Sequence, residues 1–426
     1  MTGLISIVVF IVLLVGGLPI LFALGGASFL FLYLNDIGGF IIVQRMMVGL
    51  DQFVIMAVPM FILAGNLMSH GGTTTRLVNF AKALVGHLPG GLAHVNVVVS
   101  MLFAGMSGAA AADVSALGPL EIEMMEKGGY DKEFSTAVTI SSSVIGPIIP
   151  PSLPLVVYGV VASTSIGGLF LAGIIPGIFV GIMLMLYIAY WAKINKFLPT
   201  PRASLREFAS VTKDALGPLG LPLVIVIGMY SGKFTPTEAA AIACIYAFVL
   251  GLLYKELHIK DLPKIILDSA IMTATALSIL GVSNVVSYIF ASELVPVKVG
   301  NFLVSLTDNR FLLLIIINVA FLFLGCFMET LASIALTVPI FLPIVLNLGM
   351  HPIHFGVVVA LNLTLGLLTP PVGLNLYIAS AITKLKVERI IKANMPFLGI
   401  LILCVLIITF IPQLTMFLPT CFGVGV

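Results

Sequence analysis

The chain has 426 residues, of which 60% are hydrophobic and only 9% are charged, and its mean hydropathy is +1.20. Soluble globular proteins carry about 25% charged residues, so this composition excludes a water-soluble enzyme, a nucleic-acid-binding protein and a disordered chain. The 20 basic and 18 acidic residues give a net charge of +2, which offers no field for binding a polyanion. We therefore expect a protein embedded in a lipid bilayer, with room for about ten spans at roughly 20 residues each.

Long unbroken apolar runs, rather than alternating ones, predict that the spans are α-helices and not the strands of a barrel. The break Gly16-Gly17-Leu18-Pro19 divides a first long run into two short spans. In chain order the apolar runs cover residues 3–15, 19–34, 53–69, 134–163 and 168–192, and then 215–231, 236–254, 270–291, 354–382 and 394–418.

Glycine and proline landmarks of the first half recur in the second half at one constant displacement along the chain. The pair Pro150-Pro151 falls on Pro370-Pro371, and Gly105 falls on Gly325. So many coincidences at one displacement, without a gap, indicate two homologous halves near residues 1–200 and 213–426. The other matches are Pro119 with Pro339, Gly129 with Gly349, Gly146 with Gly366 and Pro176 with Pro396.

Two segments, 92–127 and 310–347, are too long for one span and carry glycine near their middles, which predicts re-entrant hairpins. Each half then has an odd number of crossings, so the second half is inverted in the membrane. The positive-inside rule supports this topology, because 16 of the 20 basic residues fall on segments predicted to be cytoplasmic. The predicted fold is an all-α polytopic membrane protein of two inverted-topology repeats, each of five spans plus one re-entrant hairpin, with both termini periplasmic.

The tip of each hairpin and a broken span beside it carry polar and helix-breaking residues at membrane depth. A Pro-Pro pair removes two amide donors and breaks the helix before it, which frees carbonyl oxygens. These oxygens, with serine and threonine hydroxyls, form a neutral cage that suits Na⁺, and half-helix N-termini at a hairpin tip favour an anion. For one break taken alone, a Pro kink in a packed helix remains the alternative.

The sequence therefore predicts two or more sites for Na⁺ as the coupling ion, with the transported substrate between them, and no organic cofactor. Site one is assigned to Gly105, Ser107, Ser142, Ser143, Gly146 and Ile149, and site two to Gly325, Met328, Thr364, Gly366 and Thr369. The substrate site is assigned to Ser107, Ser141, Ser152, Glu329, Thr330, Asn362 and Asn375.

Three acidic residues lie within the apolar segments. Asp113 and Glu329 fit a functional role and a capping role equally well, because intramembrane acids are functional candidates by default. Glu238 follows Thr235-Pro236-Thr237 and is expected to cap a helix. The row Gly173, Gly177 and Gly181 predicts close helix packing.

Five motifs are distributed over nearly the whole chain: His87–Leu92 (HLPGGL), Ser107–Gly118 (SGAAAADVSALG), Ile145–Ser152 (IGPIIPPS), Thr235–Ala240 (TPTEAA) and Leu368–Asn375 (LTPPVGLN). They resemble the large membrane subunit of tripartite ATP-independent periplasmic (TRAP) transporters, the DctM-like or sialic acid SiaM-like family. This family often has a serine where the chain has Ala109, so the chain lacks the hydroxyl expected at that position.

The resemblance implies a subunit of a sodium-driven importer of organic acids, of the sialic acid or C4-dicarboxylate class, in the bacterial inner membrane. It implies two protein partners. One is a small four-helix membrane subunit (DctQ- or SiaQ-like), expected as a separate chain, and the other is a periplasmic substrate-binding protein (DctP- or SiaP-like). It also implies an elevator architecture, in which a transport domain moves against a fixed scaffold.

The expected transport domain contains hairpin 1 (92–127), a broken span (128–163), hairpin 2 (301–350) and a second broken span (351–383). The expected scaffold contains residues 1–70, 164–192, 214–300 and 384–426, with a cytoplasmic amphipathic connector at 71–91 and a cytoplasmic linker at 193–213. The main alternative is a sodium-coupled dicarboxylate symporter that needs no binding protein, and a channel is a further one. An intramembrane enzyme is disfavoured because the chain has no HExxH motif and no GxSxG motif at a span.

Overall fold

The computed structural model describes residues 2–197, 201–231, 233–307 and 309–424, without the side chains of some N-terminal residues and of Met106 and Ser107. Over these residues the chain forms 20 α-helices and no strand. Within the same residues, eight helical segments are long and apolar enough to cross a membrane. The prediction of an all-helical, polytopic membrane protein is confirmed to that extent. Helices satisfy their own backbone polar groups, which lipid cannot do.

The helices of the first half coincide with the apolar runs and with the first predicted hairpin. They are α1 (Thr2–Val15), α2 (Ile20–Leu34), α3 (Phe40–Leu50), α4 (Ala57–His70), α5 (Thr73–Val85), α6 (Gly91–Ser107), α7 (Ala110–Lys127), α8 (Lys132–Ser142), α9 (Leu153–Val161) and α10 (Ile166–Ile194). Hairpin 1 is the pair α6 and α7, and break 1 is the segment 143–152 between α8 and α9.

The helices of the second half begin after a stretch that includes residues 201–204. They are α11 (Leu205–Tyr230), α12 (Pro236–Leu253), α13 (Leu262–Ser292), α14 (Val295–Leu306), α15 (Arg310–Phe327), α16 (Thr330–Asn347), α17 (Pro352–Gly366), α18 (Leu374–Thr383), α19 (Val387–Phe410) and α20 (Gln413–Cys421). Hairpin 2 is the pair α15 and α16, and break 2 is the segment 367–373 between α17 and α18.

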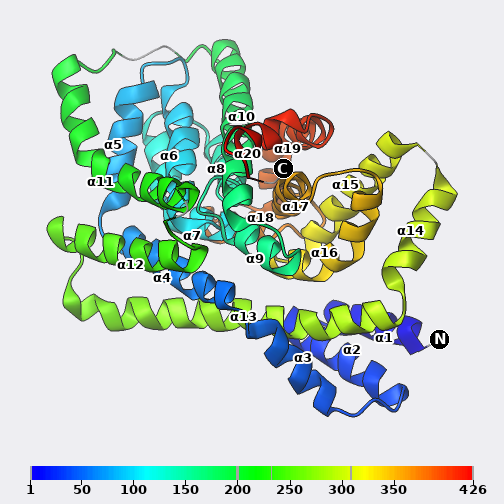
Figure 1. Ribbon diagram of the computed structural model, residues 1–426. Helices are drawn as coiled ribbons and strands as arrows, with labels where there is room; N and C mark the ends of the chain where they lie inside the picture. The colour runs from blue at the N-terminus through cyan, green and yellow to red at the C-terminus, as the bar shows by residue number, and fades with distance from the viewer. Residues whose placement is uncertain (1, 198–200, 232, 308, 425–426) are drawn as a thin grey trace.

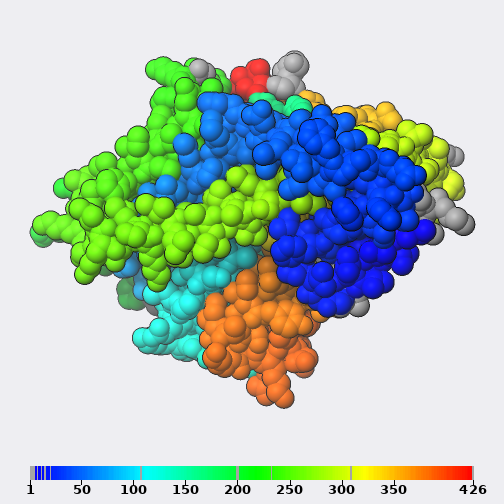
Figure 2. All heavy atoms as spheres, turned by 90° about the horizontal axis from the view of Figure 1, so that it is seen from below, coloured from blue at the N-terminus to red at the C-terminus, as the bar shows by residue number. Residues whose placement is uncertain are grey.

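The helices form a long layer and a central body. Figure 1 shows α13 running along one edge of the molecule, with α4 beside its first part and α2 and α3 beside its second part, while α12 packs on α4. The central body contains α6 to α10 and α15 to α20. Figure 2 shows the face along which α13 lies, and beyond it the adjoining surfaces of α7 and α18.

Pairs of helices, one from each half, hold the central body together. α8 packs on α19 and α10 packs on α17. α7 of hairpin 1 packs on α18, and α16 of hairpin 2 packs on α9. Each hairpin therefore contacts the short helix that follows the break in the other half.

Helix boundaries in the two halves follow the same constant displacement that relates Gly105 to Gly325. α7 begins at Ala110 and α16 at Thr330, and α8 begins at Lys132 and α17 at Pro352. Pro150-Pro151 and Pro370-Pro371 both contain a cis peptide bond. The local structures of the two breaks are thus alike at the positions that the sequence comparison pairs.

Two short helices connect the layer to the hairpins. α5 joins α4 to α6, and it is bounded by Gly72 and Gly90, whose φ angles are +71° and +78°. α14 joins α13 to α15, and it follows Leu294, whose φ angle is +53°. The predicted connector at 71–91 is therefore a helix with turns at both ends, and it packs on α6 and α11.

Several helices differ from the predicted spans. α3 was not predicted, since its run of apolar residues is only 11 residues long and contains Arg45. α13 begins at Leu262 rather than near 270, and α11 begins at Leu205, within the expected linker. α14 is a helix of its own, so the expected domain boundary at 301 falls within it, whereas hairpin 2 begins at Arg310, where the segment 310–347 was predicted to begin. The predicted span 394–418 is divided, because α19 ends at Phe410 and α20 starts after Pro412.

Candidate functional site

The tip of hairpin 2, at residues 325–329, lies directly against break 2. A Cβ on Gly366 would lie 2.4 Å from the Cα of Gly325, and a Cβ on Gly325 would lie 2.5 Å from the Leu363 carbonyl oxygen. The Gly373 amide donates a 2.9 Å hydrogen bond to the Cys326 carbonyl. Only residues without Cβ permit this approach, so the two glycines bring the backbones of tip and break together.

The tip of hairpin 1, at residues 105–109, lies against break 1 in a similar way. A Cβ on Gly108, whose φ angle is +61°, would lie 3.0 Å from both the Pro151 carbonyl oxygen and the Leu153 amide nitrogen. A Cβ on Gly105 would lie 3.2 Å from the Pro150 carbonyl oxygen. The structure therefore brings each predicted tip together with its predicted break.

Four helix N-termini lie at these two junctions. α7 begins at Ala110, two residues after Gly108, and α9 begins at Leu153 beside the same glycine. α16 begins at Thr330, and α18 begins directly after Gly373, which bonds to hairpin 2. Helix N-termini carry unpaired amides and partial positive charge. Such an arrangement favours an anion, for example a carboxylate.

Two of the predicted substrate residues carry buried polar atoms with no protein partner. They are Thr330 Oγ1, in the first turn of α16, and Asn375 Oδ1, in the first turn of α18. Ser333 Oγ, one turn after Thr330, also has none. All three residues are at most 2% exposed. Because a buried unpaired polar group costs about 1–3 kcal/mol, these atoms are candidates to bond to a ligand.

Three consecutive serines, at the end of α8 and the start of break 1, each bond to a different helix. Ser141 Oγ donates to Asn394 Oδ1 of α19 at 2.8 Å. Ser142 Oγ donates to Asn96 Oδ1 of α6 at 2.9 Å. Ser143 Oγ accepts a 3.3 Å hydrogen bond from Asn375 Nδ2 of α18. Besides the ligand and substrate roles predicted for them, these serines join hairpin 1 to two helices of the second half.

The threonines of predicted site two donate their hydroxyl protons to their own helix. Thr364 Oγ1 donates to the Ala360 carbonyl at 2.7 Å, and Thr369 Oγ1 donates to the Leu365 carbonyl at 2.9 Å. A hydroxyl that donates in this way keeps its oxygen lone pairs available. Both side chains therefore retain the capacity to bind a cation.

Asn362 and Ser152 make structural hydrogen bonds. Asn362 Nδ2 donates to Asn318 Oδ1 of α15 at 2.7 Å, which fixes hairpin 2 to α17. Ser152 is the N-cap of α9: its hydroxyl accepts from the Leu155 amide at 3.2 Å and donates to the Pro147 carbonyl. These contacts account for both residues without a substrate.

The acidic residues take up distinct positions. Glu329 is the N-cap of α16, and its carboxylate accepts from the Leu331 amide at 2.8 Å. Glu238 forms a capping box with Thr235, which confirms its expected role. Asp113 lies in the first turn of α7 beside break 1, where a Cβ on Gly146 would be 2.5 Å from Asp113 Oδ2.

Of the remaining predicted site residues, Met328 and Ile149 pack against other helices, and the side chain of Ser107 is not described. Met328 packs in a small apolar cluster with Ile279 of α13, so hairpin 2 contacts the layer through this side chain. Ile149 packs on α10, where a Cβ on Gly177 would lie 2.3 Å from its side chain. Ser107 is the last residue of α6, and its side chain lies outside the described residues.

The glycine row of α10 packs on break 1 and on hairpin 1, as expected for close helix packing. A Cβ on Gly173 would lie 2.1 Å from the Ile148 carbonyl oxygen. A Cβ on Gly181 would lie 2.5 Å from the Met101 sulfur of α6. α10 therefore packs directly on break 1 and on hairpin 1.

Sequence reasoning missed Asn96, Asn318 and Asn394, which hold the two broken helices in place. All three are nearly fully buried. Each is a carboxamide within or at the start of a long apolar run. Polar side chains at membrane depth are costly unless they have a partner, so their position in these runs could have identified them.

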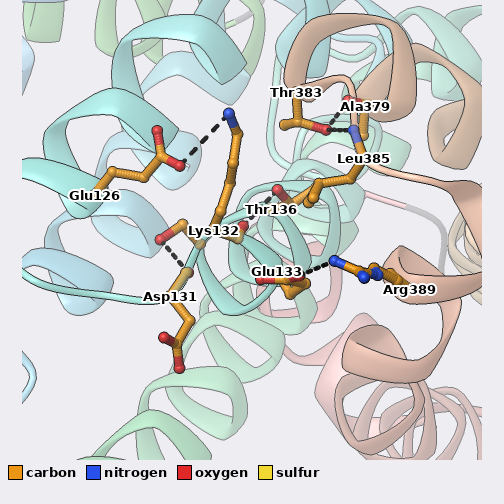
Figure 3. Close-up of polar contacts among 10 residues, drawn as sticks. Glu126, Asp131, Lys132, Glu133, Thr136, Ala379, Thr383, Leu385 and Arg389 are labelled. Carbon is orange, nitrogen blue, oxygen red and sulfur yellow. Dashed lines mark hydrogen bonds and ion pairs between the residues drawn. The ribbon is translucent and has the colours of Figure 1, made fainter.

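A charged cluster lies at the start of α8, away from the two breaks. Figure 3 shows Lys132 paired with Glu126, at 3.6 Å, and Arg389 of α19 paired with Glu133, at 3.5 Å. These pairs are partly exposed and contribute little to stability individually. The pair of Arg389 with Glu133 nevertheless links the second half to the first at one end of the central body.

The donor atoms at the two junctions suit sodium. In the described part of the chain no group of three or more His, Cys, Asp or Glu side chains could hold a metal ion. The junctions offer carbonyl and hydroxyl oxygens, which hard cations prefer. The residues present therefore fit an alkali cation better than a transition metal.

Comparison with known proteins agrees with this arrangement. Residues 7–414 match the family model of the tripartite ATP-independent periplasmic transporter, DctM component. The chain is 42% identical to the sialic acid TRAP transporter large permease protein SiaM of Vibrio cholerae, over 96% of each chain. It is 38% identical to the C4-dicarboxylate TRAP transporter large permease protein DctM of Pseudomonas aeruginosa, over 88% of each chain.

The fold also resembles that of a solved transporter. The crystal structure of the Alcanivorax borkumensis YdaH transporter matches with a TM-score of 0.61 over 87% of each chain, at 15% sequence identity. At this identity the likeness concerns the fold alone. The family match and the two permease relatives together show that this chain is a member of the DctM-component family of TRAP transporters, and hence a transporter subunit rather than an enzyme.

Proposed function

We propose that this chain is the large permease subunit of a sodium-driven importer of an organic acid, of the sialic acid or C4-dicarboxylate class. A periplasmic binding protein delivers the acid, and the small membrane subunit of the system binds this chain in the bacterial inner membrane. Membership of a tripartite family implies both partners. The observation that carries the proposal is the contact of tip and break at both junctions, together with the unpaired polar atoms of Thr330 and Asn375.

Sodium coupling is supported by the chemistry of the two junctions. Each combines a hairpin tip with a Pro-Pro break, carbonyl oxygens lie at both junctions, and the hydroxyls of Thr364 and Thr369 belong to the second. Site one is proposed at Gly105 to Ser107 with Ser142 to Ile149, and site two at Gly325 to Met328 with Thr364 to Thr369. Neutral oxygens bind Na⁺ without releasing a proton, so uptake needs a sodium gradient and not a proton gradient.

An organic anion as substrate is supported by the helix N-termini and by the relatives. The start of α16 carries unpaired hydroxyls at Thr330 and Ser333, and the start of α18 carries the unpaired side-chain oxygen Oδ1 of Asn375. The hydroxyls and the nearby backbone amides can donate to a carboxylate, whereas Asn375 Oδ1 can only accept, for example from a hydroxyl group of the substrate. SiaM and DctM are named for transport of sialic acid and of C4-dicarboxylates, and both substrate classes carry carboxylates.

We propose an elevator mechanism in which the two halves are inverted repeats with periplasmic termini. The moving domain contains both hairpins and both broken helices. α10 and α19, which the sequence assigns to the scaffold, are better grouped with the moving domain, because α10 is seated on break 1 and α19 packs on α8 and α17. The scaffold is then the layer together with α1, which packs on α2, and α11, which packs on α12. This scaffold also offers the surface for the small subunit.

The test is uptake into proteoliposomes that contain this chain and its small subunit. N-acetylneuraminate and succinate are offered with and without the binding protein, under an inward sodium gradient or with potassium in its place. We expect accumulation of one acid only when sodium and the binding protein are both present. Accumulation driven equally well without the binding protein would favour a simple symporter, and accumulation without sodium would refute the coupling proposed here.

A further inference from the structure

Two buried hydrogen-bond bridges connect Ser141, near the end of α8, and Ser143, at the start of break 1, to break 2. In the first bridge, Asn394 Oδ1 accepts from Ser141 Oγ at 2.8 Å, while Asn394 Nδ2 donates to the Leu368 carbonyl at 3.3 Å. Ser141, Leu368 and Asn394 are each at most 1% exposed. One side chain of α19 thus bonds simultaneously to the helix before break 1 and to the backbone of break 2.

In the second bridge, Asn375 takes the corresponding position on α18. Asn375 Nδ2 donates to Ser143 Oγ at 3.3 Å, and the Asn375 amide donates to the Leu367 carbonyl at 3.0 Å. The two carbonyls held in this way, Leu367 and Leu368, are neighbours within break 2. The two serines, 141 and 143, flank the Ser142 that hairpin 1 holds through Asn96.

These bridges are not a consequence of the repeated sequence pattern. The displacement that carries Pro150-Pro151 onto Pro370-Pro371 also pairs Ser141 and Ser143 with Leu361 and Leu363. The same displacement pairs Asn375 and Asn394 with Leu155 and Ile174. The same packing positions are therefore filled with apolar side chains on the other side of the body, so the fold itself does not require polar groups here.

A buried polar pair can serve as a switch contact, because its hydrogen bonds are strong in a low-dielectric interior and expensive to leave unmade. If a cation binds the carbonyl oxygens of break 2 and shifts the backbone at Leu368, Asn394 must follow that shift or lose its hydrogen bond. Asn394 in turn holds Ser141, next to the proposed ligand Ser142. Binding at one site would then change the affinity of the other site, and the effect would be reciprocal.

We propose that Asn394 is a positioning residue that couples the two candidate cation sites through Ser141 on one side and the Leu368 carbonyl on the other. This inference rests on the proposed sodium coupling and deepens it. It assigns cooperative sodium dependence to one identified side chain, which belongs to neither predicted ligand set.

The experiment measures uptake against sodium concentration in proteoliposomes with the small subunit and the binding protein. Asn394→Leu removes both hydrogen bonds at nearly constant volume, and Ser141→Ala removes only one. Asn66→Leu is the matched control, since Asn66 Nδ2 of α4 also donates to a serine, Ser269 of α13, at 2.8 Å, but far from both breaks in the chain and in the layer rather than the body. Size-exclusion profiles establish that each variant is folded.

For the unchanged chain we expect a sigmoidal sodium dependence. For Asn394→Leu we expect the Hill coefficient to fall to about 1 and the half-saturating sodium concentration to rise about 5-fold or more. Ser141→Ala should lower the Hill coefficient in the same direction, and the double variant should match Asn394→Leu. Asn66→Leu should keep the Hill coefficient of the unchanged chain.

The outcomes distinguish the coupling role of Asn394 from sodium-driven transport itself. If Asn394→Leu and Ser141→Ala keep the original Hill coefficient, the coupling role is wrong while sodium-driven transport stands. If Asn394→Leu does not fold, the Hill coefficient of Ser141→Ala alone decides whether the coupling role is right. If the unchanged chain takes up the acid independently of sodium, the proposed function fails and the coupling role fails with it.

Discussion

The contact between Gly325 and Gly366 gives the sharpest test of site two. A Cβ on Gly366 would lie 2.3 Å from the Gly325 carbonyl carbon and 2.8 Å from the Cys326 nitrogen. All of these neighbours are backbone atoms, which cannot rotate away as a side chain can. Gly366→Ala must therefore push the tip of hairpin 2 off break 2, and the hydrogen bond from the Gly373 amide to the Cys326 carbonyl, 2.9 Å, is strained or lost.

The magnitude follows from two contributions. Overpacking by one methyl group costs about 1–3 kcal/mol, and a lost hydrogen bond costs about 0.5–1.5 kcal/mol, so the closed contact is weakened by about 1.5–4.5 kcal/mol. Because the proposed cation cage requires tip and break together, the half-saturating sodium concentration should rise by about 10-fold or more. Thermal stability without sodium should change little, because the hairpin can separate locally without unfolding.

The assay combines sodium-dependent uptake with thermal unfolding in the presence and absence of sodium. Gly399→Ala is the control, because this glycine also lies in a helix but has no atom within 4 Å of an added Cβ. We expect sodium to raise the Tm of the unchanged chain and of Gly399→Ala but not that of Gly366→Ala. A Gly366→Ala protein with the original half-saturating sodium concentration would show that the tip and break contact is not part of a sodium site.

Three further predictions concern the substrate and the ions. Thr330→Val removes an unpaired buried hydroxyl, so it should leave Tm unchanged or raise it while lowering uptake of the acid; a loss of Tm with normal uptake would contradict a ligand role. Thr369→Ala should raise the half-saturating sodium concentration about 10- to 150-fold if the hydroxyl binds the ion directly, and an unchanged value would restrict site two to carbonyls. Two Na⁺ with a monoanion carry a net charge of +1, so a potassium–valinomycin potential of about 100 mV, worth about 2.3 kcal/mol, should increase accumulation roughly 50-fold. Uptake that does not respond to the potential would contradict this stoichiometry.

The sequence was sufficient for the features that depend on local chemistry. The Pro-Pro pairs and the glycines at 105 and 325 predicted broken helices beside hairpin tips, because proline and glycine act on their own backbone. The capping role of Glu238 was predicted for the same reason. What the sequence could not show is which distant side chains meet, and so it assigned Ser141 and Asn362 to the substrate although their nearest partners are Asn394 and Asn318.

Helix boundaries were less predictable where packing outweighs hydropathy. α3 is short and contains Arg45, but the arginine stacks over the Tyr288 ring of α13 at 4.5 Å, which stabilises a helix that composition alone does not favour. Similarly, α14 was not predicted as a helix of its own, since residues 301–306 were grouped with hairpin 2, and its contacts with α13 and α16 distinguish it from that hairpin.

The two connecting helices α5 and α14 set a mechanical limit on any relative displacement of the body and the layer. Each is the direct covalent link between a layer helix and a hairpin, and each has a backbone turn with positive φ at its layer end. With 13 and 12 residues they are rigid rods of about 20 Å and 18 Å. A rod that pivots at one end carries its other end along an arc of fixed radius, so the separation of hairpin and layer is limited by the rod length plus the reach of the loops at the rod ends. The two rods differ by a single residue, so in the elevator motion proposed above the two hairpins would follow arcs of nearly equal radius.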